Sequence, residues 1–140
     1  MHSSTSNIKI RILVVDDEPD ILLALNVVLE GRGHYVETFN NPEVALAHLT
    51  TSEVTPYDLI ITDYRMPGSG MSGLDLAKRV KEHAGRTRRK TKVFLMSGSF
   101  DVSSLPEQIS VALKSGIIDE IIQKPIPNDK LIAIVEKRSS

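Results

Sequence analysis

The chain has 140 residues, enough for one ordinary domain and too few for two of that size. Apolar residues make up 41% of it, so a chain of this length buries about 68% of its unfolded surface, which excludes extensive disorder. The chain has no Cys and no Trp, and its formal net charge is −1. Disulfides, thiolate metal ligands and a cysteine nucleophile are therefore excluded.

The longest apolar runs have five residues, as in Ile21 to Leu25, whereas a membrane-spanning helix needs about 18. Met1 to Asn7 is polar and lacks the features of a signal peptide. We therefore expect a soluble, cytoplasmic protein that does not bind membranes. We expect residues 1–7 to form a flexible tail and residues 8–138 to form a single domain, with no output domain after it.

Short apolar runs alternate five times with longer segments of helical periodicity, which is typical of a parallel sheet with crossover helices. The predicted strands are Arg11 to Val15, Tyr35 to Phe39, Leu59 to Thr62, Val93 to Met96 and Ile118 to Gln123. The first predicted helix begins at Pro19 and ends before Gly31 and Gly33, and the second begins at Pro42 with Asn41 as its cap. The other three predicted helices are Ser72 to His83, Leu105 to Lys114, and Asn128 to Arg138. This pattern predicts an α/β fold with a doubly wound five-stranded sheet.

The segment from Lys78 to Lys92 carries eight Lys or Arg and one acid, Glu82, a net charge of +7. Such a segment could bind nucleic acid or an acidic partner, but a solvated helix end and loop is the simpler interpretation. The four His residues do not cluster in the sequence, and we interpret them as surface or loop residues.

Polar residues directly follow four of the predicted strands. They are Asp16, Asp17, Asp63, Ser97 and Lys124. Any one of them has an ordinary explanation as a helix cap, a turn residue or a solvated lysine, but ligands of open α/β sheets bind at the carboxyl ends of the strands. The set therefore indicates a single site at this edge.

Four motifs occur in order at these strand ends. They are VVDDEP, which contains Asp16 and Asp17, ITDYRMP with Asp63, LMSG with Ser97, and QKP with Lys124. With them the chain resembles the receiver domain of two-component response regulators, from Ile8 to Arg138. The resemblance implies a flavodoxin-like fold with five βα units and strand order 2-1-3-4-5. It also implies a cis peptide bond before Pro125.

The resemblance assigns Asp63 as the phosphoacceptor, and a carboxylate is a competent nucleophile toward phosphorus. Lys124 would supply a positive charge and Ser97 a hydroxyl to the phosphoryl oxygens. Strands lie about 4.8 Å apart, and a lysine stem spans about 6 Å, so Lys124 can reach a group on Asp63 two strands away.

The resemblance also implies bound Mg²⁺, because crowded carboxylates repel one another and need a hard divalent cation. Asp17 and Asp63 would ligate the ion directly, Arg65 through its backbone carbonyl, and Asp16 through water.

The implied function is to accept a phosphoryl group from a histidine kinase or phosphotransfer protein. The receiver would then signal to a downstream protein through the fourth helix, fifth strand and fifth helix. The resemblance makes the chain a signalling protein rather than an enzyme, assisting only its own aspartyl phosphorylation and dephosphorylation. Direct nucleic-acid binding is not expected, and a phosphorylation-dependent dimer stays open.

Three features depart from the family pattern. Ile121 stands where the family typically carries an aromatic residue that couples phosphorylation to the signalling face. The loop from Met66 to Gly73 is two residues longer than usual. Ser97 and Lys124 lie 27 positions apart, so the fourth helix or its flanking loop is enlarged.

Other functions stay open at this point. Because Ile121 replaces the usual aromatic residue, a receiver-like docking scaffold that works without phosphorylation stays an alternative. A Mg²⁺-dependent phosphohydrolase of the haloacid dehalogenase kind also uses an aspartate nucleophile, but its Asp-x-Asp-x-Thr motif is not matched by Asp16 to Pro19. A nucleic-acid binder would use Arg86 to Lys92, and its affinity would fall with salt.

Overall fold

The computed structural model describes residues 8–51, 53, 55–87, 90–98 and 103–137, and the side chains of all of these except 86 and 87. Five parallel strands form one sheet in the order β2-β1-β3-β4-β5, as the resemblance implied. The strands are β1 Arg11–Val15, β2 Tyr35–Phe39, β3 Leu59–Asp63, β4 Lys92–Ser97 and β5 Glu120–Gln123. The expected tail, residues 1–7, lies outside the described residues.

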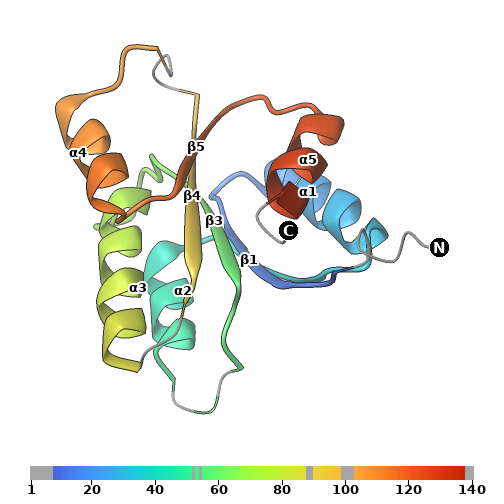
Figure 1. Cartoon of the computed structure of the whole chain (residues 1–140), viewed down its shortest axis with the longest axis horizontal. Helices are drawn as coiled ribbons and strands as arrows, with labels where there is room; N and C mark the ends of the chain where they lie inside the picture. The colour runs from blue at the N-terminus through green and yellow to red at the C-terminus, as the bar shows by residue number, and fades with distance from the viewer. Residues whose placement is uncertain (1–7, 52, 54, 88–89, 99–102, 138–140) are drawn as a thin grey trace.

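Helices cover both faces of this sheet (Figure 1). They are α1 Pro19–Gly31, α2 Pro42–Leu49, α3 Gly73–Thr87, α4 Glu107–Ser115 and α5 Asn128–Lys137. Helices α1 and α5 lie on one face, and α2, α3 and α4 lie on the other (Figure 1). None of the helices in the described part of the chain has the length and apolarity needed to span a membrane.

Two apolar layers form because successive strand residues point to opposite faces of the sheet. Leu13 and Val15 belong to the layer under α2, α3 and α4, whereas Ile12 and Val14 belong to the layer under α1 and α5. All four are fully buried, as are most residues of β3 and β4. A strand buried on both faces needs the continuous apolar run that the sequence shows.

Most predicted elements are confirmed to within two residues, including the Asn41 cap, whose Oδ1 accepts hydrogen bonds from the Glu43 and Val44 amides at 2.8 and 3.0 Å. Helix α3 runs on to Thr87 instead of ending at His83, and its apolar face continues with Ala84, which is buried one turn after Val80.

Strand β5 begins at Glu120 instead of Ile118, because the Ile118 amide donates to the Ala112 carbonyl and belongs to the turn after α4. The Lys124–Pro125 peptide bond is cis, as the resemblance implied.

Candidate functional site

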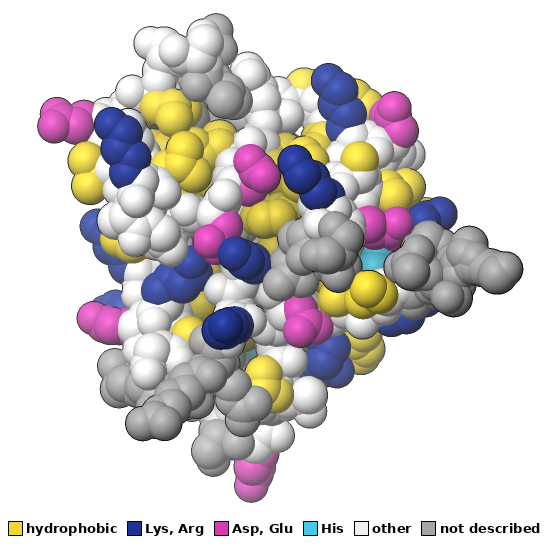
Figure 2. All heavy atoms as spheres, in the orientation of Figure 1, with side chains coloured by type: hydrophobic (Ala, Val, Ile, Leu, Met, Phe, Trp, Pro, Cys, Tyr) yellow, Lys and Arg dark blue, Asp and Glu magenta, His cyan; other side chains and the backbone are white. Residues whose placement is uncertain are grey.

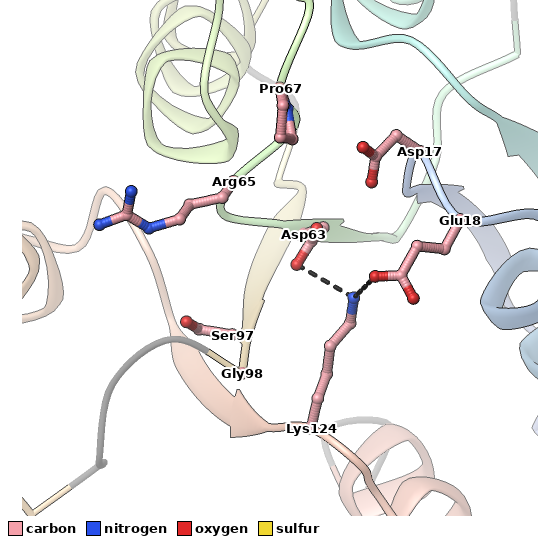
Figure 3. A pocket seen from close by; sticks show the side chains of 8 residues that line it. All are labelled: Asp17, Glu18, Asp63, Arg65, Pro67, Ser97, Gly98 and Lys124. Carbon is pink, nitrogen blue, oxygen red and sulfur yellow. Dashed lines mark ion pairs between the residues drawn. The ribbon is translucent and has the colours of Figure 1, made fainter.

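The carboxyl ends of four strands meet at one edge of the sheet. The register pairs Val15 with Thr62, which brings Asp16 beside Asp63, and it pairs Ser97 with Gln123, which brings Lys124 to the same edge. A pocket of about 300 Å³ opens there (Figure 3). It is lined by Asp17, Glu18, Asp63, Arg65, Pro67, Ser97, Gly98 and Lys124.

Lys124 contacts acids from two other strand ends. Its Nζ lies 2.8 Å from Asp16 Oδ2. It also lies 3.2 Å from Asp63 Oδ1 and 3.8 Å from Glu18 Oε2 (Figure 3). Its backbone amide donates to the Ser97 carbonyl at 2.9 Å, which fixes the start of the side chain. The lysine therefore spans the distance from β5 to β3, as the strand spacing predicted.

The pocket holds more negative charge than Lys124 compensates. The side chain of Asp63 is only 8% exposed and that of Asp16 is fully buried. Burial, followed by the charge of Asp16, raises the pKa of Asp63 to about 6, although Lys124 acts in the opposite direction. Burial likewise raises the pKa of Asp16. Burial would lower the pKa of Lys124, but its contacts with Asp16 and Asp63 outweigh burial and raise it.

The acids after β1 have the chemistry of a site for a hard divalent cation. Asp16, Asp17 and Glu18 each place a carboxylate oxygen within 4.8 Å of the others. Asp16 Oδ1 accepts a hydrogen bond from the Glu18 amide at 2.9 Å, whereas its buried Oδ2 forms the ion pair with Lys124 Nζ at 2.8 Å. An all-oxygen set of this kind suits Mg²⁺.

The carboxylate cluster after β1 includes Glu18, for which no role was predicted from the sequence, beside Asp16 and Asp17. Asp63 lies in the same pocket and contacts Lys124, and its expected role as a metal ligand stays a prediction. The described contacts do not test the expected roles of the Arg65 carbonyl and of a water at Asp16. The unbroken acidic run after β1 was the signal that could have found Glu18.

Ser97 is 2% exposed and lies on the far side of the pocket from Asp17, toward Arg65 (Figure 3). Asp63, Lys124 and Ser97, the three side chains expected to surround a phosphoryl group, all line this pocket, although the Ser97 hydroxyl points away from the other two (Figure 3). Their chemical roles stay a prediction.

Gly73 supports the backbone of Asp63, a role that was not predicted from the sequence. A Cβ at Gly73 would lie 2.0 Å from the Asp63 carbonyl oxygen, and the Gly73 amide donates to the Tyr64 carbonyl at 2.8 Å. Ser72 and Asp75 then cap α3 reciprocally, since the amide of each donates to the side chain of the other. A glycine at the end of a long loop and before a helix was the available signal.

The long loop before Gly73 docks on α2. Ser69 Oγ donates to Glu43 Oε1 at 2.8 Å and accepts from the Met71 amide at 3.1 Å. Ile121, the residue in place of the usual aromatic, is half-buried and packs against the apolar layer under α2, α3 and α4.

The basic segment contains ion pairs in its described part. Lys81 Nζ lies 2.9 Å and Lys92 Nζ 3.8 Å from the carboxylate of Asp119, which precedes β5. On the face seen in Figure 2, basic and acidic side chains are interspersed. Residues 88–89 and the Arg86 side chain lie outside the described part, so nucleic-acid binding by Arg86 to Lys92 stays untested.

His34 lies in the loop between α1 and β2, as the surface-or-loop interpretation allows, but it is buried, with 4% exposed. Its ring accepts a hydrogen bond from the Ile10 amide and contacts Glu136 of α5, so both ring nitrogens have partners away from water. Nothing in the local sequence pattern identifies these partners.

The chain is similar to known proteins over most of its length. The family model of the response regulator receiver domain matches residues 12–136. The nitrogen assimilation regulatory protein NtrX of Azorhizobium caulinodans is 32% identical over 126 residues, which cover 90% of this chain and 25% of the relative. The transcriptional regulatory protein FixJ of Bradyrhizobium diazoefficiens is 30% identical over 126 residues, 90% of this chain and 55% of the relative.

The solved structure of the BeF3-activated DrrB receiver domain has a TM-score of 0.71 and 26% identity, with 93% of this chain and 97% of that chain covered. The chain thus matches a whole receiver domain but only 25% to 55% of the length of the two regulatory proteins.

Proposed function

This chain belongs to the response regulator receiver domain family, whose members are signalling domains, and we propose that it accepts a phosphoryl group on Asp63 from a histidine kinase or phosphotransfer protein. The observation that carries the proposal is the contact of Lys124 Nζ with Asp63 Oδ1 at 3.2 Å, beside the acids after β1. A receiver-like scaffold that never takes a phosphoryl group would not need this convergence of buried charges.

In the proposed transfer, a carboxylate oxygen of Asp63 attacks the phosphorus of a phosphohistidine. The O–P bond forms as the N–P bond breaks, and the histidine nitrogen keeps the electron pair and takes up a proton from solvent. Because the pKa of Asp63 is about 6, the carboxylate is mostly ionised at neutral pH. Lys124, with its raised pKa, stays cationic to neutralise charge on the phosphoryl oxygens, and Ser97 donates its hydroxyl.

Receiver domains generally bind Mg²⁺ at an acidic cluster, and this chain has one. We assign Asp17 and Asp63 as direct ligands with the Arg65 carbonyl, and Asp16 as a ligand through water. Glu18 adds a further carboxylate at the rim. When bound, the ion supplies positive charge that lowers the repulsion between these carboxylates and the incoming phosphoryl oxygens.

Signal output is proposed to use the face formed by α4, β5 and α5, with a protein partner. Two conformations of similar free energy are required, and the phosphoryl group must favour one of them. Ile121 cannot form the hydrogen bond of an aromatic phenol, so another side chain must connect the pocket to this face.

Intact-mass spectrometry after incubation with Mg²⁺ and acetyl phosphate tests the proposal. The wild type should gain one phosphoryl mass, and Asp63→Asn should gain none. Asp129→Asn on α5 removes an exposed carboxylate outside the pocket and should label like the wild type. Equal labelling of wild type and Asp63→Asn would disprove the assignment, and no labelling of the wild type would favour the scaffold.

Calorimetry tests the metal site separately. Mg²⁺ uptake should be strongly weakened by Asp17→Asn and little changed by Asp20→Asn, which removes an exposed acid in the first turn of α1. Equal uptake by both variants would contradict the ligand assignment. Steady release of phosphate from small phosphate esters would instead favour the phosphohydrolase.

A further inference from the structure

Tyr64, the residue after Asp63, joins the pocket to α4. Its backbone is held on both sides, since its amide donates to the Met96 carbonyl and its carbonyl accepts from the Gly73 amide, both at 2.8 Å. Its side chain is half-buried and packs against the apolar layer under α2, α3 and α4. The position of the Tyr64 ring therefore depends on its side-chain contacts rather than on a mobile backbone.

The Tyr64 hydroxyl reaches the first turn of α4. Gln108 Nε2 donates to it at 2.7 Å, and both residues are accessible enough for this bond to open and close. Helix α4 begins after Pro106 without a side-chain cap, and its buried residues are Ile109 and Ala112. A helix start that lacks a cap depends more on tertiary contacts such as this hydrogen bond.

Arg65 connects Tyr64 to the pocket. Its guanidinium carbon lies 5.6 Å from the centroid of the Tyr64 ring, within the range of a cation–π contact. Arg65 lines the same pocket as Asp63, yet its side chain extends away from the Asp63 carboxylate (Figure 3). It is exposed and long enough to change direction without moving the backbone.

We propose that Arg65, Tyr64 and Gln108 transmit the state of Asp63 to α4, in place of an aromatic residue at position 121. The inference rests on the proposed function. Phosphorylation replaces the single negative charge of the Asp63 carboxylate with the about 1.5–2 negative charges of a phosphoryl group, and these attract the Arg65 guanidinium. When Arg65 leaves the Tyr64 ring, the ring loses one of the contacts that hold it, and the hydrogen bond to Gln108 opens. The first turn of α4 is then released.

Thermodynamic linkage gives the sign of the test. If the phosphorylated conformation lacks the Tyr64–Gln108 bond, removing that bond in advance favours this conformation. Beryllium fluoride with Mg²⁺ serves as the probe at Asp63, and ¹⁹F NMR measures its half-saturating concentration. Tyr64→Phe and Gln108→Leu should each lower that concentration about fivefold, the equilibrium effect of one ordinary hydrogen bond. The double variant should lower it no further.

Tyr35→Phe is the matched control, since it removes a phenol hydroxyl from the exposed edge strand β2 and should leave the half-saturating concentration unchanged. A bond with a merely structural role would lower the melting temperature in the Tyr64 and Gln108 variants without changing probe affinity. That result would overturn the proposal, as would fully additive effects in the double variant.

Hydrogen exchange of the α4 amides gives a second readout. The probe should speed exchange in the first turn of α4 in the wild type, and Tyr64→Phe should already exchange at the faster rate without it. If the wild type binds the probe but α4 does not respond, this inference alone is overturned. If the wild type neither binds the probe nor labels with acetyl phosphate, the proposed function is overturned, and the inference with it.

Discussion

Carboxylates are handled in opposite ways in two regions of the molecule. In the pocket, Asp16 and Asp63 share a single cation, and burial raises the pKa of both. In the His34 cluster, which comprises Arg32, His34 and Glu136, each buried polar atom has a complementary partner. The cluster joins the end of α1 and the start of β2 to α5.

The contacts of the His34 cluster determine its protonation pattern. The Ile10 amide donates to His34 Nδ1 at 3.3 Å, so Nδ1 carries no proton and Nε2 donates to Glu136 Oε2 at 3.2 Å. Arg32 donates to both Glu136 oxygens, at 2.9 and 2.7 Å. These bonds, led by those from Arg32, lower the pKa of Glu136 although burial opposes them.

The opposite directions of the pKa shifts separate a ligand site from a structural contact. A carboxylate with a lowered pKa already has its partners and stabilises the folded state at neutral pH. A carboxylate with a raised pKa destabilises the folded state until a cation or a proton arrives. The uncompensated carboxylates of the pocket therefore destabilise the folded state, and a bound cation can relieve this destabilisation. The His34 cluster has no such uncompensated carboxylate.

The largest expected effect comes from Gly73→Ala, which would place a methyl group 2.0 Å from the Asp63 carbonyl oxygen. Neighbouring backbone cannot move aside as a side chain would, so we expect a loss of about 3 kcal/mol in the free energy of unfolding. Urea denaturation measures it. Gly85→Ala, in the same helix and with open space around it, should instead stabilise by about 0.5–1 kcal/mol. Equal effects would show that packing against Asp63 is unimportant.

Asp63→Asn should stabilise the protein by about 2–3 kcal/mol at pH 7.5 without divalent cations, because it removes a carboxylate whose native pKa of about 6 exceeds its ordinary 3.8. Between pH 6 and pH 4 the native wild type binds more protons than the unfolded chain, so its stability from this group rises as pH falls. The advantage of the variant should therefore disappear near pH 4. A constant difference across this window would contradict the raised pKa.

Glu136→Gln tests the other region, and we expect it to destabilise by about 1 kcal/mol at pH 7, because His34 loses a charged acceptor. The pH dependence has the opposite sign. The native pKa of Glu136 lies below its ordinary 4.5, so its contribution is present above that pH and is lost as pH falls through the native value. Thermal unfolding at several pH values from 7 to 3 measures both the loss of stability and its pH dependence. Glu30→Gln on the exposed face of α1 is the control.

Arg32→Gln should have the smallest effect, although it removes the shortest contacts of the His34 cluster. The Arg32 side chain is 43% exposed, and exposed ion pairs contribute little because solvent screens them. The melting temperature of the Arg32→Gln variant should equal that of the wild type within error, and the difference between the two should not change with salt. If Arg32→Gln lowered the melting temperature more than Glu136→Gln does, the ion pair with Arg32 would stabilise the fold more than the contact with His34.

Local patterns in the sequence were sufficient to predict the strands and most helix limits. Apolar runs such as Leu59 to Thr62 have few alternatives to a buried strand, and Asn41-Pro42 is a strong helix start. The strand ends also predicted which side chains converge, because parallel strands place their carboxyl ends at one edge. Lys124 accordingly meets Asp63.

Contacts between segments that are distant in the chain were decided by the tertiary structure alone. Gly73 touches the Asp63 carbonyl, Gln108 meets Tyr64 across 44 positions, and His34 meets Glu136 across 102. Periodicity reports which face of an element is buried, but it does not report which atoms of another element lie opposite that face. Hydrogen bonds and close backbone contacts depend on those atoms to within a fraction of an ångström, and only the packed chain specifies them.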